Sequence, residues 1–559
     1  MSSFRGIETR NELADFLRIP RWKLTHILYI KHIENLYTAF TIPKKSGGER
    51  HINAPTDELK SVQKKLATVL WEYQKKIWNE KNIQPNISHA FEEKKSILTN
   101  SKIHKNKRFV LNIDLENFFD SFHFGRVRGF FAKNKNFNLP IEVATIIAQL
   151  TCYKGCLPQG APSSPIITNF ICQSLDIKIL RIAKKYKLDY TRYADDLSFS
   201  TNNKYFLSNY SAFTLELSVE IERAGFKIND SKSRLLYRDS RQEVTGLIVN
   251  KKINVDRRYY KSTRAMANRL FTTGVFEIDG IKASINQLEG RFAFINQIER
   301  YNNEIDGKPH SCRHLCSREE QYRKFIFYKY FLSNDTPLII TEGKTDIAYL
   351  KSALKNLSNN YPNLISVTDL NYDFQISFLN RSKRLRYFLG ISQDGADTIK
   401  NIYNFYVGKE GLPNYLQYFK EKFGVRPQKP VIFVFDNELM NKDKPLSKFA
   451  NHAGLKDTDK TKLSENLYVK LSDNLYLLTN PILKDKKEAE IEDLFDSNTL
   501  SHEINGKKFS LSSNFDNSKF YGKEIFSKYI SSNYKNIDFS GFKRFLDGLN
   551  EIINSYDNA

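Results

Sequence analysis

Runs of apolar and β-branched residues predict strands in the first part of the chain, and acids follow two of these strands. "RFVLNID" (108–114) is a β-prone run that ends in Asp114. "YTRYADDLSFS" (190–200) alternates on both sides of an Ala-Asp-Asp sequence, which predicts two strands joined by a tight turn. Between them, "LPQGAPSSPIITNF" (157–170) is a Gly- and Pro-rich loop that leads into an apolar helix. The pattern predicts one acid at a strand end and two, Asp195 and Asp196, at a hairpin tip.

The second part of the chain alternates predicted strands with predicted helices. "TPLIITEGKTDIAYLKSAL" (336–354) predicts a strand, an acidic turn and a helix, and "FLGISQDGADTIKNIYNF" (388–405) predicts a strand, a glycine turn and a helix. "KPVIFVFDNEL" (429–439) is a further buried-looking strand that ends in acids. This alternation predicts a parallel α/β sheet, in which functional sites lie at the carboxyl ends of the strands.

Charge is spread unevenly along the sequence. The net charge is +23, and residues 1–330 hold 55 basic against 34 acidic residues, while residues 331–559 hold 31 against 29. Such an excess in the first part is expected of a protein that grips a polyanion such as nucleic acid. Residues 251–300 interleave Lys and Arg with aromatic residues at helical spacing. This is typical of a helix that tracks a nucleic-acid duplex, or of a basic amphipathic helix packed on a neighbouring domain.

Length and composition narrow the class of protein further. At 559 residues the chain is too long for one core. No stretch approaches the ~18 consecutive apolar residues of a membrane span, and the first residues have no apolar signal-peptide core. The five cysteines are few and odd in number, which argues against a disulfide framework. We therefore expect a cytoplasmic protein with no membrane segment.

The three acids of the first part suit a metal site. Clustered carboxylates repel one another unless a cation compensates, and two Mg²⁺ ions can do so while they activate a hydroxyl and stabilise a leaving pyrophosphate. The order, wording and spacing of the three segments resemble reverse transcriptase motifs A, B and C, most closely those of bacterial retron reverse transcriptases. The resemblance implies an α+β right-hand polymerase with fingers, palm and thumb. It also implies that two Mg²⁺ ions are held by Asp114, Leu115 (through its backbone carbonyl), Asp195 and Asp196.

The resemblance extends to the residues that contact the dNTP substrate. "IPKKSGGERHINAPTDELKSVQKKL" (42–66) resembles the fingers segment, and "AGFKINDSKSRLL" (224–236) resembles motif D. Motif D makes Lys232 a candidate proton donor to pyrophosphate, although a solvated lysine explains it equally well. Phe119, five positions after Asp114, falls where the family has an aromatic residue that selects deoxynucleotides. A phenylalanine packed in the core is an equally good explanation of this residue type. The implied substrate-binding residues are Lys44, Lys45, Arg50, Phe119, Gln159 and Gly160.

One short motif bears on the RNA partner. "EVTGLIVN" contains Val244-Thr245-Gly246, a triplet that retron enzymes carry after motif D, whereas residues 121–156 contain no Asn-Ala-x-x-His, another retron signature. The resemblance implies a structured noncoding RNA as partner and template, a 2′-hydroxyl of that RNA as primer, and a branched RNA-DNA hybrid (msDNA) as product. A group II intron-type or abortive-infection-type reverse transcriptase with different priming is the alternative.

The acids of the second part resemble a TOPRIM domain, the Mg²⁺-binding module of topoisomerases, bacterial primases and OLD-family nucleases. Glu342 matches the glutamate of its Glu-Gly motif, and Asp436 and Glu438 match its Asp-x-Asp motif, with Glu in place of the last Asp. "AEIEDLFD" (489–496) resembles a further acidic motif of OLD-like nucleases and makes Glu492 an additional candidate ligand. The resemblance implies one or two Mg²⁺ ions and a nuclease that cleaves a nucleic-acid target in antiphage defence. A non-catalytic scaffold that docks the RNA-DNA product is the alternative.

These patterns and resemblances together predict four regions. They are reverse transcriptase fingers and palm (1–250), a thumb that binds RNA or a duplex (251–332), a TOPRIM domain (333–500) and a helical C-terminal extension (501–559) whose role the sequence does not indicate. The oligomeric state is likewise not indicated.

Overall fold

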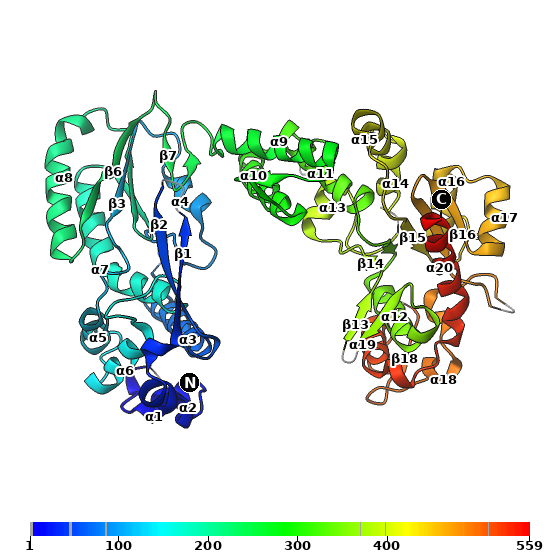
Figure 1. Cartoon of the computed structure of the whole chain (residues 1–559), viewed down its shortest axis with the longest axis horizontal. Helices are drawn as coiled ribbons and strands as arrows, with labels where there is room; N and C mark the ends of the chain where they lie inside the picture. Colours follow the sequence, from blue (N-terminus) through cyan, green and yellow to red (C-terminus); the bar gives the residue numbers. More distant parts are fainter. Residues whose placement is uncertain are drawn as a thin grey trace. The chain divides into compact units, whose positions relative to one another are not determined.

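The computed structural model of the chain divides into two compact units, Met1–Arg257 and Arg258–Ala559 (Figure 1). It describes residues 4–43, 47–83, 86–309, 311–368, 371–396, 399–483, 486–512 and 514–558. The predicted fingers and palm region (1–250) falls inside the first unit. Most of the predicted thumb region (251–332) belongs to the second unit, together with everything that follows it. Among the described residues, no helix combines the length and the apolar character needed to cross a membrane.

The first unit combines helices with a central antiparallel sheet. Apart from short 3-10 and π turns, its elements are α1 (Arg10–Phe16), α2 (Arg21–Thr25), β1 (Tyr37–Pro43), β2 (Glu49–Pro55), α3 (Asp57–Glu80), α4 (Ile97–Ile103), β3 (Phe109–Leu115), α5 (Phe124–Lys133), α6 (Ile141–Thr151), α7 (Ser164–Lys185), β4 (Asp189–Tyr193), β5 (Asp196–Thr201), α8 (Phe206–Arg223), β6 (Ile228–Tyr237), β7 (Glu243–Val244) and β8 (Leu247–Ile248).

The central sheet of the first unit positions the first set of acids. Its strand order is β4-β5-β3-β6, with every neighbouring pair antiparallel. The predicted strand before Asp114 is β3, and the predicted hairpin is β4 and β5. Helix α8 lies along this sheet in Figure 1. Phe199 of β5 and Phe213 of α8 are fully buried with ring centroids 5.2 Å apart, so the face away from the acids is sealed by apolar packing.

A separate two-stranded hairpin, β1 and β2, precedes the sheet. Its register runs from Tyr37 opposite Pro55 to Pro43 opposite Glu49. Most of its side chains are exposed, but the backbone N–H of Asn53 in β2 donates to the carbonyl oxygen of Gln159 at 2.9 Å. The hairpin is therefore tied to the loop that leads into α7.

The second unit begins with helices and continues as an α/β fold. Apart from short turns, its elements are α9 (Arg257–Thr273), β9 (Glu277–Ile278), β10 (Ile281–Lys282), α10 (Ile285–Ile305), α11 (Ser317–Phe327), β11 (Leu338–Thr341), α12 (Lys344–Asn356), β12 (Ile365–Thr368), β13 (Asn371–Phe374), β14 (Ser377–Phe378), α13 (Lys383–Leu389), α14 (Lys400–Val407), α15 (Tyr415–Phe423), β15 (Val431–Phe435), α16 (Pro445–Ala453), α17 (Asp457–Asn466), β16 (Tyr468–Ser472), β17 (Leu475–Thr479), α18 (Ser497–Leu500), β18 (Lys508–Phe509), β19 (Phe520–Tyr521), α19 (Lys523–Asn533) and α20 (Lys543–Asp557).

The sheet of the second unit has the order β14-β11-β15-β17-β16. Strands β14, β11, β15 and β17 run parallel, and only β16 is antiparallel to its neighbour. Strands β11 and β15 are buried along their whole length, as expected for strands covered on both faces. The strand predicted at the start of 388–405 is wrong: Phe388 and Leu389 end helix α13, because Ser382 caps that helix and Gly390 (φ 65°) stops it in the left-handed region.

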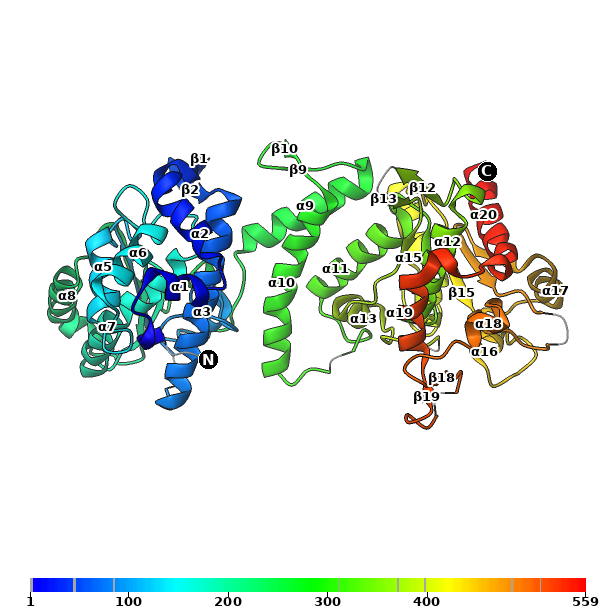
Figure 2. The same cartoon turned by 90° about the horizontal axis from the view of Figure 1, so that it is seen from below.

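Two hydrophobic cores on opposite sides of this sheet bind its parts together. One contains Phe271 of α9, Phe292 of α10 and Phe433 of β15, so the helices after residue 257 share a core with the α/β fold. The other contains Ile432 of β15 and Leu549 of α20. Figure 2 shows α19 and α20 packed on the α/β part (Figure 2). The C-terminal extension is therefore a structural layer of this unit.

Candidate functional site

The first acidic cluster lies where β3 meets the β4–β5 hairpin. Asp114 pairs in register with Asp196 across the two strands, and the backbone N–H of Leu115 donates to the carbonyl oxygen of Asp195 at 3.1 Å. Ala194 turns the hairpin with φ 57°. The fold thus brings the three acids predicted from sequence to one edge of one sheet.

Burial and mutual repulsion perturb these acids. Burial, followed by the charges of Asp195 and Asp114, raises the pKa of Asp196 to about 7. Burial also raises the pKa of Asp195, while the charges of Lys232 and Arg50 oppose this rise. Groups whose pKa is shifted by burial and by like charges are typical of functional sites.

Lys232 and Asn229 of β6 contact the cluster directly. The Lys232 ammonium lies 3.0 Å from Asp114 Oδ2, and the Asn229 side-chain amide donates to the same oxygen at 3.1 Å. The Lys232 side chain is 58% exposed, so its ammonium lies on the solvent side of the cluster.

The other predicted substrate residues are distributed around the cluster. Lys44 and Lys45 lie outside the described residues. The charge of Arg50, on β2, lowers the pKa of Asp195. Gln159 is half-buried next to β2. Gly160 adopts φ 120°, and a Cβ there would lie 2.9 Å from the carbonyl oxygen of Asn53. Glycine is therefore required at position 160 because the loop passes close to the β2 backbone.

Phe119, the predicted selector of deoxynucleotides, is half-buried. Its ring packs edge-on against Phe118 with centroids 5.5 Å apart, and Phe118 stacks on Phe226. Its position is compatible with selection of deoxynucleotides and with a role in the core, because part of the ring packs on the core and the rest is partly accessible.

Val244-Thr245-Gly246 forms the turn between β7 and β8. Thr245 and Gly246 both have positive φ, 46° and 83°, as a two-residue hairpin turn requires. Val244 is fully buried beside Val110 and Val249. The triplet is thus a turn anchored on β3 of the central sheet.

Sequence reasoning missed two buried polar residues at the hairpin: Arg192, on β4 itself, and His104, which contacts both hairpin strands. Arg192 is fully buried, forms a two-pronged ion pair with Asp176 and donates to the carbonyl oxygen of Ala194 at 3.3 Å. His104 is fully buried and bridges the hydroxyls of Thr191 and Ser200, one on each hairpin strand. A charged residue inside a β-prone run was the available signal for Arg192, whereas His104 had none.

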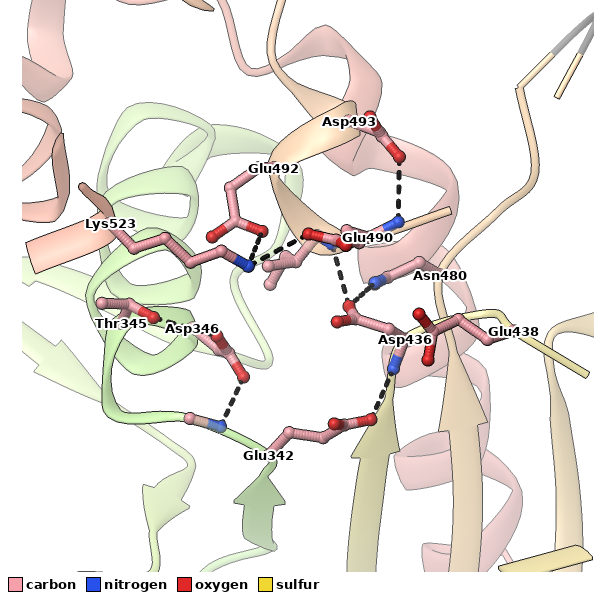
Figure 3. A network of polar contacts seen from close by, with 12 residues as sticks. Glu342, Thr345, Asp346, Asp436, Glu438, Asn480, Glu490, Glu492, Asp493 and Lys523 are labelled. Carbon is pink, nitrogen blue, oxygen red and sulfur yellow. Dashed lines mark hydrogen bonds and ion pairs between the residues drawn. The ribbon is translucent and has the colours of Figure 1, made fainter. Parts of the chain in front are cut away.

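The second acidic cluster lies at the carboxyl ends of three neighbouring parallel strands (Figure 3). Glu342 follows β11 and accepts a hydrogen bond from the backbone N–H of Asp436, which follows β15, at 3.0 Å. Asp436 Oδ1 accepts from the Asn480 side chain, after β17, at 2.8 Å and from the backbone N–H of Ile491 at 2.9 Å. The topology thus unites residues that are far apart in the sequence.

The carboxylates of this cluster are buried together. Burial raises the pKa of Glu342 to about 8, and the charges of Asp346 and Glu438 add to the rise. Burial likewise raises the pKa of Asp436 and of Glu492. Glu438 is buried but forms an ion pair with Lys444.

Two residues absent from the sequence prediction complete this cluster. Asp346 lies in the first turn of α12 and accepts from the backbone N–H of Gly343 at 2.9 Å. Lys523, at the start of α19, lies 3.0 Å from Glu492 and 3.1 Å from Glu490. Although burial opposes it, the charges of these two acids raise the pKa of Lys523. "EGKTD" signalled Asp346, but no local pattern signalled Lys523.

The donors in both clusters suit Mg²⁺, because they are carboxylate oxygens with few other ligand types nearby. In the described part of the chain, no three His, Cys, Asp or Glu side chains already converge as a preformed metal ligand set. The carboxylates instead hold protein donors, such as Lys232 on Asp114. Ion binding would therefore exchange these contacts for the cation.

Comparisons with known proteins identify the family. Residues 42–255 match a family model described as "Reverse transcriptase (RNA-dependent DNA polymerase)". Retron Ec86 reverse transcriptase from Escherichia coli is 32% identical over 303 residues, which cover 53% of this chain and 87% of that protein. Retron Mx65 reverse transcriptase from Myxococcus xanthus is 29% identical over 307 residues, which cover 52% of this chain and 68% of that protein.

Another relative and a solved structure are more distant. Retron Ec48 reverse transcriptase from Escherichia coli is 24% identical over 373 residues, which cover 64% of this chain and 82% of that protein. A structure of apo telomerase from Candida Tropicalis truncated from the C-terminal domain has a TM-score of 0.30 and 15% identity, covering 41% of this chain and 56% of that chain, and so low a score supports no argument. On the strength of the Ec86 match, the chain belongs to the retron reverse transcriptase family.

Proposed function

We propose that the first cluster is the polymerisation site, in which Asp114, Asp195 and Asp196 hold two Mg²⁺ ions. When bound, these ions would activate the attacking hydroxyl and stabilise the leaving pyrophosphate. The register pairing of Asp114 with Asp196, with Asp195 beside them, is the observation that carries the proposal. Lys232 would give a proton to pyrophosphate, and its exposed ammonium 3.0 Å from Asp114 Oδ2 supports this role.

Primer extension with dNTPs and Mg²⁺ tests this proposal. Asp195→Asn together with Asp196→Asn should abolish DNA synthesis, because the paired negative charge that would hold the cations is lost. Asp189→Asn, on β4 of the same hairpin, is the matched control and should retain synthesis. Retained synthesis in the double variant would refute the assignment.

We also propose that the enzyme copies its own noncoding RNA and primes from a 2′-hydroxyl, so that its product is a branched msDNA. Membership of the retron family supports this step. The chain should be expressed with its flanking locus and the copurified nucleic acid treated with a 2′-5′ debranching enzyme. Release of linear DNA supports the proposal, whereas an unbranched product of active enzyme favours a reverse transcriptase with different priming.

For the second cluster we propose a TOPRIM-like, Mg²⁺-dependent phosphodiesterase that acts in antiphage defence. Glu342, Asp436 and Glu492 would hold the metal, with Glu438 as a further candidate ligand. The meeting of Glu342 and Asp436 at the ends of adjacent parallel strands favours this function. A bound metal would supply an activated water, and Lys523 would neutralise charge on the phosphate.

Glu342→Gln tests the second activity against Glu465→Gln, an exposed glutamate on α17. The first variant should lose Mg²⁺-dependent nucleic-acid cleavage and phage protection, while both variants keep DNA synthesis. Full protection by folded Glu342→Gln would instead favour a non-catalytic scaffold that docks the RNA-DNA product.

A further inference from the structure

A basic cavity in the second unit lies apart from the acidic cluster of that unit. It is formed by α9, α11 and α15 and has a volume of about 750 Å³. Its charged lining residues are all cationic, and its aromatic lining residues come from α9 and α15. The cavity is lined by Lys261, Arg264, Ala265, Asn268, Phe271, Gln321, Lys324, Tyr418, Lys422 and Phe423.

The cations of this cavity have no acidic partners in the described parts of the chain. No carboxylate of a described residue forms an ion pair with Lys261, Arg264, Lys324 or Lys422, and none lines the cavity. Basic residues that face elsewhere on the same helices do have partners: Arg269 of α9 pairs with Glu277 at 3.5 Å, and Lys420 of α15 pairs with Asp473 at 3.7 Å. Several uncompensated cations in one concave site favour a ligand with more than one negative charge.

The aromatic residues narrow the class of ligand. The Lys324 ammonium lies 4.4 Å from the centroid of the Tyr418 ring, and the Lys422 ammonium lies 5.5 Å from the same centroid. The Phe423 ring packs edge-on against the buried Phe271, with centroids 5.5 Å apart, so it is held in place. Half-buried rings beside cations can stack a base while the cations bind its phosphates.

A cavity of this size favours a single strand over a duplex as its ligand. Ligand pockets of about 300–1,000 Å³ enclose small molecules or short segments. Bases in a duplex are already stacked on one another and cannot reach a ring inside a cavity, so duplex contacts are made mainly to the backbone. A single strand can place an unpaired base and its flanking phosphates there.

We propose that this cavity binds a short segment of single-stranded nucleic acid, with a base on Tyr418 or Phe423 and adjacent phosphates on Arg264, Lys422 and their neighbours. The site is distinct from both acidic clusters and does not depend on the activity of either. Single-stranded DNA and RNA share the recognised chemistry, and the experiment separates them.

The test compares two charge-matched double variants of the full chain. Arg264→Gln with Lys422→Gln removes cations from the cavity, whereas Arg269→Gln with Lys420→Gln removes the same charge from the same helices outside it. Fluorescence anisotropy would measure the binding of dT12, rU12 and a blunt 12-base-pair duplex. Salt would be varied from about 50 to about 200 mM, because the logarithm of the affinity falls over this range in proportion to the number of phosphate contacts. Loss of two phosphate contacts should reduce the slope of log K against log salt by about 1.4 for a single strand.

A variant that removes the stacking ring and a crosslinking experiment test whether the single strand binds in this cavity. Tyr418→Ala should weaken single-strand binding by roughly tenfold and leave duplex binding unchanged. A bromouracil-labelled single strand should crosslink to the α15 peptide on irradiation. Preference for dT12 or rU12 identifies the natural strand. Equal effects of the two double variants, equal sensitivity of the duplex, or crosslinks that avoid α9, α11 and α15 would overturn the proposal.

Discussion

The buried ion pair between Arg192 of β4 and Asp176 of α7 yields a sharp prediction about stability. Arg192 donates to both carboxylate oxygens of Asp176 at 2.8 Å, and the two side chains are 1% and 6% exposed. In Arg192→Met, the Tyr190 hydroxyl, 2.9 Å away, would be the one side-chain donor that the described residues still offer to the buried carboxylate. Breaking a buried pair by removing one partner costs about 3–5 kcal/mol, so we expect a loss of this size in the free energy of unfolding.

Urea unfolding followed by tryptophan fluorescence measures this loss in the intact chain. All three tryptophans lie in the first unit, so their signal reports on the unit that contains Arg192. The matched control is Lys178→Met on the same helix as Asp176. Lys178 pairs with Glu220 at 3.0 Å but is 48% exposed, and its loss should cost less than about 1 kcal/mol.

A double variant separates the desolvation penalty from the attraction between the charges. Arg192→Met with Asp176→Leu removes both charges and leaves no buried carboxylate without a cation. It should therefore be more stable than Arg192→Met alone, although the polar contacts to Asn169 and Ala194 are still lost. A loss below about 1 kcal/mol in Arg192→Met, or a double variant no more stable than Arg192→Met, would refute the reasoning.

Three further predictions use the same structure. Gly160→Ala should destabilise the first unit by about 1–3 kcal/mol in the same fluorescence assay, because φ 120° is strained and the new Cβ meets Asn53, whereas Gly129→Ala, with open space in a helix, should not. Burial lowers the pKa of His104 to about 3, so the unfolded state binds more protons than the folded state below the ordinary pKa of 6.5. The free energy of unfolding should therefore fall by up to about 1.4 kcal/mol for each pH unit as the pH is lowered from 6.5 to 3. His104→Gln should flatten this slope. Lys523→Met should leave the buried Glu492 carboxylate without this cation and destabilise the second unit by about 1–3 kcal/mol, measured by near-ultraviolet circular dichroism, and an unchanged transition would contradict the ion pairs of Figure 3.

Local patterns were sufficient for the parts of the fold that depend on neighbouring residues. The alternation around Asp195 predicted the β4–β5 hairpin, and the apolar run before Asp114 predicted β3, because side-chain period and turn chemistry are local properties. The same logic failed at Phe388 and Leu389. Their short apolar run is compatible with a strand or a helix end, and capping by Ser382 and Gly390 decided for the helix.

The sequence by itself determined which acids stand at strand ends, since each follows a β-prone run directly. Only the tertiary structure decided what surrounds them. Lys523 reaches Glu492 because α19 packs back onto the α/β sheet, and the cavity beside Tyr418 exists because α9 and α15 share one core. Contacts between segments distant along the chain depend on burial and chain topology, which no local periodicity records.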